Sequence, residues 1–171
     1  MKIHVLSLGL ALATSHLAAA QAGPALSAAD KAAIEATLGQ FRKNLDDHKF
    51  SEMPTYTTPD ISFVNVVGMF WQGEADVQRA HQAIFDRLYK GVKLPPADPS
   101  QLVFRAITPD VVLVTSRSTA PARADGGAAP TGDSGQSVFN TLLVKRGGKW
   151  LITMGQNTPV NAQAAAGNPV R

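Results

Sequence analysis

The chain has 171 residues, with 16 Lys or Arg against 13 Asp or Glu, and no cysteine. The lack of cysteine excludes disulfide stapling and thiol catalysis, so buried apolar side chains have to hold the fold together. The basic residues are scattered and form no stripe interleaved with aromatic side chains, which argues against a nucleic-acid partner. This length is sufficient for one domain with a hydrophobic core.

The beginning of the chain has the order of features of a cleavable signal peptide. Lys2 supplies a positive charge, residues 5–12 form a short apolar run, and a stretch of small residues follows. The run is shorter than the ~20 residues that span a bilayer, which disfavours a membrane anchor. We therefore expect residues 1–20 to be a leader, cleaved after Ala20 or Ala22. The mature protein is then periplasmic or secreted, with no membrane association.

The first half of the chain mixes helix and strand signals. Ser27, followed three positions later by Asp30, resembles a capping box, and apolar residues then recur at helical spacing. Further on, a β-branched run bounded by Asp60 and Gly68 indicates a strand. The elements predicted here are a helix over 28–46, a short helix or turn over 49–58, strands over 61–67 and 69–72, and a helix over 74–89.

The second half is mostly strands. A Pro109-Asp110 turn separates two of them, and Gly147-Gly148 reads as a two-residue hairpin with positive φ at both positions. The predicted strands cover 101–107, 111–117, 138–146 and 149–156. Small and polar residues over 120–135 predict a mobile loop, and residues 159–171 predict a flexible tail.

This order of elements predicts an α+β domain. A strongly curved, mostly antiparallel sheet of about six strands is expected to wrap over three helices. The space between the sheet and the helices is the natural place for a pocket.

Strand alternation assigns candidate residues to that pocket. Trp150, Ile152, Met154 and Gln156 fall on one face if the strand is regular, which brings Gln156 to the end of an apolar wall. The hairpin then places Leu143 opposite Ile152, and Thr141 opposite Met154.

Asn65 similarly shares a face with Ile61 and Phe63. Each amide, Asn65 or Gln156, is either satisfied within the fold or available to a ligand.

His81 lies on the apolar face of its helix, so its ring is expected to point toward the sheet. One hypothesis makes it a general acid or base, with Asp60 as its partner. The other makes it a core histidine that holds a backbone carbonyl or Asn65.

Other chemistries have no pattern in the chain. No G-x-G-x-x-G follows a strand, no pair of histidines has metal-ligand spacing, and no serine sits in a G-x-S-x-G elbow. We expect neither a cofactor nor a metal.

Several short motifs follow one another along the chain: the stretch over 60–68, Trp71-Gln72-Gly73, Pro109-Asp110-Val111, the run over 148–152, and Gln156-Asn157-Thr158. Over residues 27–158 this set resembles the SnoaL-like branch of the nuclear-transport-factor-2-like superfamily, in the subgroup labelled SgcJ/EcaC. The resemblance implies a cone-shaped barrel with a pocket at its wide end, and a homodimer. It does not choose between the isomerases, cyclases, hydratases and binding modules of the superfamily.

Ketosteroid isomerase, which shares the superfamily fold, uses an Asp base and a Tyr oxyanion donor. Those positions correspond here to Asn65 and to a place near Phe41. An amide does not accept the substrate proton and a phenyl ring does not stabilise an enolate, so that reaction is not expected.

The leading hypothesis is an exported protein that binds a small, mostly apolar molecule. Its pocket would be lined by Phe63, Asn65, Trp71, His81, Phe85, Trp150 and Gln156. If it is an enzyme, it would be a cofactor-free isomerase, cyclase or hydratase working by proton transfer at His81. The alternative is a non-catalytic ligand-binding or dimerisation module.

Overall fold

The computed structural model describes residues 23–92, 94–119 and 135–170; the predicted leader, its cleavage site and nearly all of the predicted loop over 120–135 lie outside them. The helices are α1 (Ala28–Asp47), α2 (Glu74–Arg87) and α3 (Ala162–Ala166), and two 3₁₀ turns are η1 (Met53–Thr55) and η2 (Pro99–Gln101). The strands are β1 (Thr57–Val64), β2 (Phe70–Gln72), β3 (Val103–Thr108), β4 (Val111–Thr119), β5 (Gln136–Arg146) and β6 (Lys149–Pro159).

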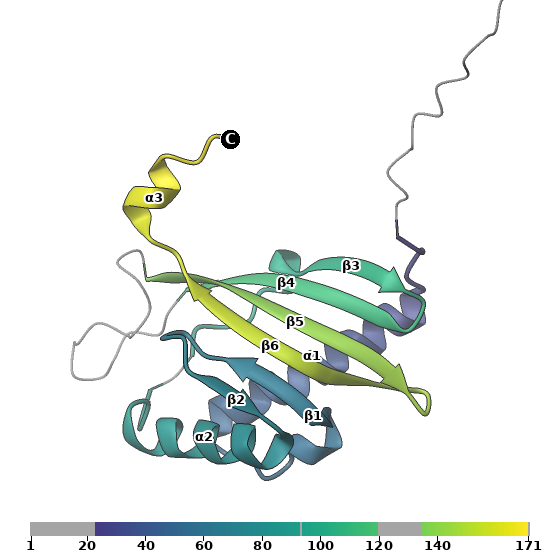
Figure 1. Ribbon diagram of the computed structural model, residues 1–171, viewed down its shortest axis with the longest axis horizontal. Coiled ribbons are helices and arrows are strands. Elements are labelled where there is room, and N and C mark those ends of the chain that lie inside the picture. The colour runs from purple at the N-terminus through teal and green to yellow at the C-terminus, as the bar shows by residue number, and fades with distance from the viewer. Residues whose placement is uncertain (1–22, 93, 120–134, 171) are drawn as a thin grey trace, which may run out of the picture.

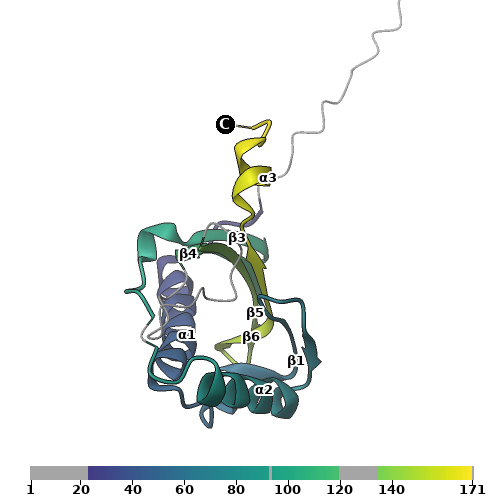
Figure 2. The ribbon, with the colours of Figure 1, turned by 90° about the vertical axis from the view of Figure 1, so that its left-hand side faces the viewer.

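The six strands form one curved sheet in the order β2-β1-β6-β5-β4-β3. Every neighbouring pair is antiparallel except β1 and β6, which run parallel. Figure 1 and Figure 2 show α1 and α2 on the same side of the sheet, which curves around α1, while α3 projects away at the end of the chain. We call the side that faces α1 and α2 the concave face and the opposite side the outer face. The predicted α+β fold is confirmed.

Helix α1 begins and ends where its local chemistry requires. The Ser27 hydroxyl accepts a hydrogen bond from the backbone N–H of Asp30 at 3.0 Å, which satisfies one of the free donors of the first turn. His48 ends the helix in the left-handed conformation at φ 55°, and its N–H donates to the Asn44 carbonyl. The buried side of the helix includes Ile34 and Phe41.

The segment before β1 differs from the prediction. Only the 3₁₀ turn η1 forms within residues 49–58, and β1 already starts at Thr57 instead of Ile61. The early start was missed because Pro59 lacks the N–H that a regular ladder needs. Here Pro59 lies where the pairing of β1 with β6 is interrupted, between Thr57 and Ser62, so no ladder bond is lost.

The hairpin between β5 and β6 forms as predicted, with φ 57° at Gly147 and 78° at Gly148. Leu143 pairs with Ile152, also as predicted. The pairing of Thr141 with Met154 is wrong: Met154 pairs with Leu142, and Thr141 pairs with Gly155.

The cause is a β-bulge at Thr153, an extra residue that has no partner on β5. Each side chain of β6 beyond the bulge therefore points to the face opposite to the one that simple alternation assigns.

The core lies between the concave face and the two large helices. Its members are fully or nearly buried, and each large apolar side chain contributes about 1.5–3 kcal/mol. They include Ile34, Phe41, Phe50, Met53, Ile61, Phe63, Val77, Phe85, Val112, Val114, Leu143, Trp150 and Ile152. Among the described residues, no helix is long and apolar enough to cross a membrane.

Candidate functional site

His81 is buried on the side of α2 that packs against the sheet, with 6% of its surface exposed. Its Nδ1 lies 2.8 Å from the backbone carbonyl of Val77, one helical turn earlier. A carbonyl only accepts hydrogen bonds, so Nδ1 carries the proton and donates it. This bond is the one expected if His81 is a core histidine that holds a backbone carbonyl, which is one of the two hypotheses for this residue.

Four aromatic rings enclose the imidazole. Their centroids lie at 4.5 Å for Phe63, 5.3 Å for Phe50, 5.4 Å for Trp71 and 5.9 Å for Phe41. The Phe63 and Phe41 rings meet the imidazole nearly edge to face, at 86° and 83°. Together with Phe139, which contacts Phe41 and Phe63, we call these rings the aromatic cluster.

This enclosure controls the charge of His81. Burial lowers its pKa to about 4, because the rings replace the water that would solvate an imidazolium, and the bond to the Val77 carbonyl only partly offsets this effect. At pH 7 the ring is therefore neutral, with its proton fixed on Nδ1. A group with this pKa is a weak base, and at neutral pH it lacks the second, imidazolium proton that a general acid would donate.

Asp60 does not lie beside His81. Its carboxylate is 68% exposed and pairs with Arg146 at 3.5 Å. A hydrogen bond from the Thr58 hydroxyl, followed by smaller contributions that include the charge of Arg146, keeps the pKa of Asp60 below its usual value. The two residues of the predicted acid–base pair therefore lie in different environments, His81 in the core and Asp60 on the surface.

The Asn65 amide closes the turn between β1 and β2. Its Oδ1 accepts hydrogen bonds from the backbone N–H groups of Val67 at 3.0 Å and Met69 at 2.8 Å. Of the two alternatives for Asn65, these bonds correspond to an amide that is satisfied within the fold.

Gln156 lies on the outer face. It pairs with Val64 on β1 and with Asn140 on β5, both of which follow the outer-face alternation. The expectation that it shares a face with Trp150 and Ile152 is wrong, because the bulge at Thr153 reverses the alternation between them.

Phe85 and Trp150 lie apart from the centre of the cluster. Phe85 packs against Phe50, His48 and Tyr89 toward the end of α2, with centroids 5.0–5.2 Å apart. The predicted pocket residues Phe63, Trp71 and His81 are therefore in mutual contact, whereas the remaining predicted residues serve other parts of the fold.

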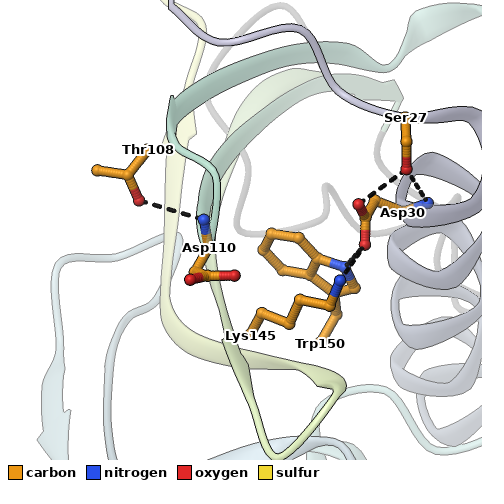
Figure 3. Close-up of polar contacts among 6 residues, drawn as sticks. All are labelled: Ser27, Asp30, Thr108, Asp110, Lys145 and Trp150. Carbon is orange, nitrogen blue, oxygen red and sulfur yellow. Dashed lines mark hydrogen bonds and ion pairs between the residues drawn. The ribbon is translucent and has the colours of Figure 1, made fainter.

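Trp150 belongs to a polar cluster at the start of α1 (Figure 3). Asp30 Oδ1 accepts hydrogen bonds from Lys145 Nζ at 2.7 Å and from Trp150 Nε1 at 2.8 Å, while the Ser27 hydroxyl donates to Oδ2 at 2.8 Å. These bonds, that of Lys145 first, lower the pKa of Asp30 to about 2. The cluster fastens the first turn of α1 to the β5–β6 hairpin, so we assign it a structural role.

The space between the sheet and the helices is filled by side chains. The cavity lined by Phe41, Met53, Thr57, Ile61, Phe63, Val77, Phe139 and Ile152 measures about 10 Å³. That volume holds one water molecule at most. At the rim of the aromatic cluster, Trp71 and Phe139 are only partly buried.

Asn157, which sequence reasoning did not single out, lies at this rim. It pairs with Phe139, so its side chain shares the concave face with the Phe139 ring. Its Oδ1 is buried and has no hydrogen-bond partner among the residues that the structure describes. The correct register of β6 would have identified it, because the bulge turns Asn157 inward as it turns Gln156 outward.

Metal chemistry gains no support from the geometry. Within the described ranges, no group of three or more His, Asp or Glu side chains is arranged to hold a metal ion.

A family model for the SnoaL-like domain matches residues 34–157, which is most of the chain and includes most of α1, the aromatic cluster and Asn157. The chain belongs to the SnoaL-like domain family. No curated protein matches the sequence of this SnoaL-like protein. The finer assignment to the SgcJ/EcaC subgroup stays a prediction.

Solved structures similar to this SnoaL-like domain share its architecture. An uncharacterised Caulobacter vibrioides protein with a cystatin-like fold is 29% identical, with 82% of this chain and 96% of that chain covered and a TM-score of 0.68. An NTF2-like protein of unknown function from Pseudomonas putida is 12% identical, with 82% and 94% covered and a TM-score of 0.64. A Streptomyces avermitilis protein described as a proposed dehydratase of the NTF2-like family is 16% identical, with 78% and 98% covered and a TM-score of 0.62.

Proposed function

We propose that this SnoaL-like domain is a non-catalytic homodimeric module that binds a small, mostly apolar molecule on its concave face. The observation that carries the proposal is the state of His81, the residue best suited by type for acid–base work. It is neutral, enclosed by four rings and bonded through Nδ1 to its own helix.

The competing hypothesis is cofactor-free isomerisation, cyclisation or hydration by proton transfer at His81. It needs a pKa near the working pH and a substrate within hydrogen-bond reach, whereas His81 has a pKa of about 4 and a ring covered by aromatic side chains. The likeness to the Streptomyces protein concerns the fold at this level of identity. We expect mass spectrometry to recover each bound compound unchanged after incubation. A product that forms with the wild type and not with His81→Gln would contradict the proposal.

Binding is supported by the aromatic rim. Trp71 stacks on Phe63 with centroids 6.0 Å apart and 17° between the rings, yet it stays partly exposed, as does Phe139. Partly exposed aromatic rings beside a buried polar atom are typical of sites for small apolar ligands.

A thermal-shift series with sterols, terpenoids and polyketide-like ketones tests this half of the proposal. A compound that binds only the folded protein raises its melting temperature in a saturable manner. Trp71→Ala should abolish the response, while Trp150→Phe, at the other end of the concave face, should keep it. If no compound in the series stabilises the wild type, the proposed binding role fails.

Dimerisation is supported by the outer face of the sheet. In the described ranges neither α1 nor α2 covers this face (Figure 1). Across β4, β5 and β6 the register aligns two apolar rows, and a polar row of Thr115, Asn140 and Gln156 lies next to the second of them. On β3, Arg105 lies opposite Leu113 at the edge of the second row. The apolar rows consist of Val111, Val144 and Leu151, and of Leu113, Leu142 and Met154.

A face of this kind suits a second copy of the same chain. The polar row contains amides that both donate and accept, so it is self-complementary across a two-fold axis. The test is sedimentation equilibrium with Leu142→Lys, which places a charge at the centre of the face. We expect the wild type to be a dimer and this variant a monomer with unchanged circular dichroism. Leu88→Lys, an exposed apolar position on the helix side, should remain a dimer. A monomeric wild type or a dimeric Leu142→Lys would refute the interface.

We also propose that the protein is exported, on the basis of the charge and the apolar run at the start of the chain. N-terminal sequencing of protein recovered from the periplasm or medium of an expressing bacterium should begin at Gln21 or Gly23. Retention of the full chain in the cytoplasm would contradict export.

A further inference from the structure

Asn157 carries a buried acceptor that the fold leaves unused. Its Oδ1 is buried and has no hydrogen-bond partner in the described part of the chain, although the residue as a whole is partly exposed. The neighbouring amides of the sheet are used differently: Asn65 accepts two backbone N–H bonds, and Asn140 accepts from the Thr115 hydroxyl at 2.7 Å.

An unused acceptor of this kind is costly to keep. Nearly all buried polar groups in folded proteins have a hydrogen-bond partner, and leaving one without a partner weakens folding. A group that brings an O–H or N–H donor to Oδ1 recovers that loss, whereas a group that brings only an acceptor or a methyl does not.

The surroundings of Asn157 define the rest of the ligand. On one side the concave face carries the rings of the aromatic cluster, and Gly155 leaves room for them: a Cβ there would lie 2.4 Å from the Phe63 ring. On the other side the register brings small hydroxyl side chains to the same face, with Ser116 opposite Phe139 and the Ser118–Ser137 pair beyond it, 2.9 Å apart. Asn157 thus stands at the border between an apolar and a polar surface.

We propose that Asn157 is the residue that selects the ligand, and that the ligand class is a small apolar ring or hydrocarbon body bearing a hydroxyl or amine donor. The body packs against the rings at the rim of the aromatic cluster, and the donor hydrogen-bonds to Oδ1 of Asn157. This inference rests on the binding half of the proposed function. It narrows the ligand to alcohols, phenols and amines, and disfavours the matching ketones and hydrocarbons.

Phenol and toluene make a suitable pair of probes, because they differ only in a hydroxyl against a methyl group. Each is titrated into the isotopically labelled full domain, and the Asn157 side-chain amide and the Trp71 indole signals are followed by NMR. We expect saturable shifts of both signals, with phenol binding about tenfold more tightly than toluene, the size expected for one buried hydrogen bond.

Asn157→Leu keeps the size of the side chain and removes the acceptor, so phenol should then bind no better than toluene. Asn140→Leu, an amide on the outer face of the same strand pair, should leave the preference for phenol intact. If Asn157→Leu fails to fold, Asn157→Ala tests the same point, because it also removes the acceptor and should abolish the preference for phenol.

The outcomes separate the two proposals. Equal binding of phenol and toluene by the wild type overturns the role of Asn157 and leaves the apolar binding site standing. If neither phenol nor toluene binds, both the role of Asn157 and the apolar binding site are overturned.

Discussion

Acidification from pH 7.5 to 5.0 is expected to destabilise the domain through His81. The pKa of this imidazole is about 4 in the folded protein, because burial disfavours its charged form, against 6.5 as the reference value. The unfolded chain therefore takes up the proton first as the pH falls. The free energy of unfolding therefore has its full contribution from His81 above pH 6.5, and this contribution is lost progressively as the pH falls toward 4.

The magnitude follows from the two pKa values. They differ by about 2.5, and each unit corresponds to 1.36 kcal/mol, so the loss reaches about 3 kcal/mol below pH 4. At pH 5.0 the folded protein is still almost unprotonated at His81 while the unfolded chain is almost fully protonated. The expected loss in the free energy of unfolding there is about 2 kcal/mol.

Urea unfolding followed by tryptophan fluorescence measures this loss at the two pH values. His81→Phe removes the titrating group and keeps an aromatic ring inside the cluster, so it should lose about 2 kcal/mol less than the wild type between pH 7.5 and 5.0. The exposed carboxylates are common to both proteins and cancel in this difference. His48→Gln is the matched control and should lose as much as the wild type. Equal losses in the wild type and His81→Phe would refute the reasoning.

Two further substitutions test the packing and the polar cluster. Gly155→Ala should destabilise the domain by about 1–3 kcal/mol in urea unfolding, because its Cβ would meet the Phe63 ring at 2.4 Å, while Gly39→Ala, with open space on α1, should stabilise it by up to about 1 kcal/mol; equal effects would contradict the close approach. Asp30→Asn should lower the melting temperature at pH 7, and the difference from the wild type should shrink as the pH falls from 3.8 toward 2, where Asp30 itself becomes protonated. Asp60→Asn, an exposed control, should have little effect; a melting temperature equal to that of Asp30→Asn would argue against the cluster.

Local chemistry made several elements predictable. The Ser27 cap, the Gly147-Gly148 turn and the Pro109-Asp110 turn each depend on neighbouring residues only, and each forms where the pattern indicates. The apolar face of α2 likewise placed His81 against the sheet, because the spacing of residues on one face of an α-helix follows from the helix itself.

The candidate site was harder to predict, because the β-bulge at Thr153 depends on how two strands pair. Alternation alone assigned Gln156 to the concave face, and one inserted residue exchanged its place with that of Asn157. Strand alternation also did not show that Asn65 is used within its own turn, where it accepts from the backbone two and four residues later. The bond of Asp60 to Arg146 instead of His81 joins residues far apart in the chain, so no local spacing encodes it.

The central claim is that His81 is a neutral, structural histidine inside an aromatic cluster, and its imidazole nitrogens report on this directly. Nitrogen-15 NMR of the folded domain should find the proton on Nδ1 at pH 7 and a titration midpoint near 4. A midpoint between 6 and 7, or a proton on Nε2, would contradict the account and return His81 to the list of catalytic candidates.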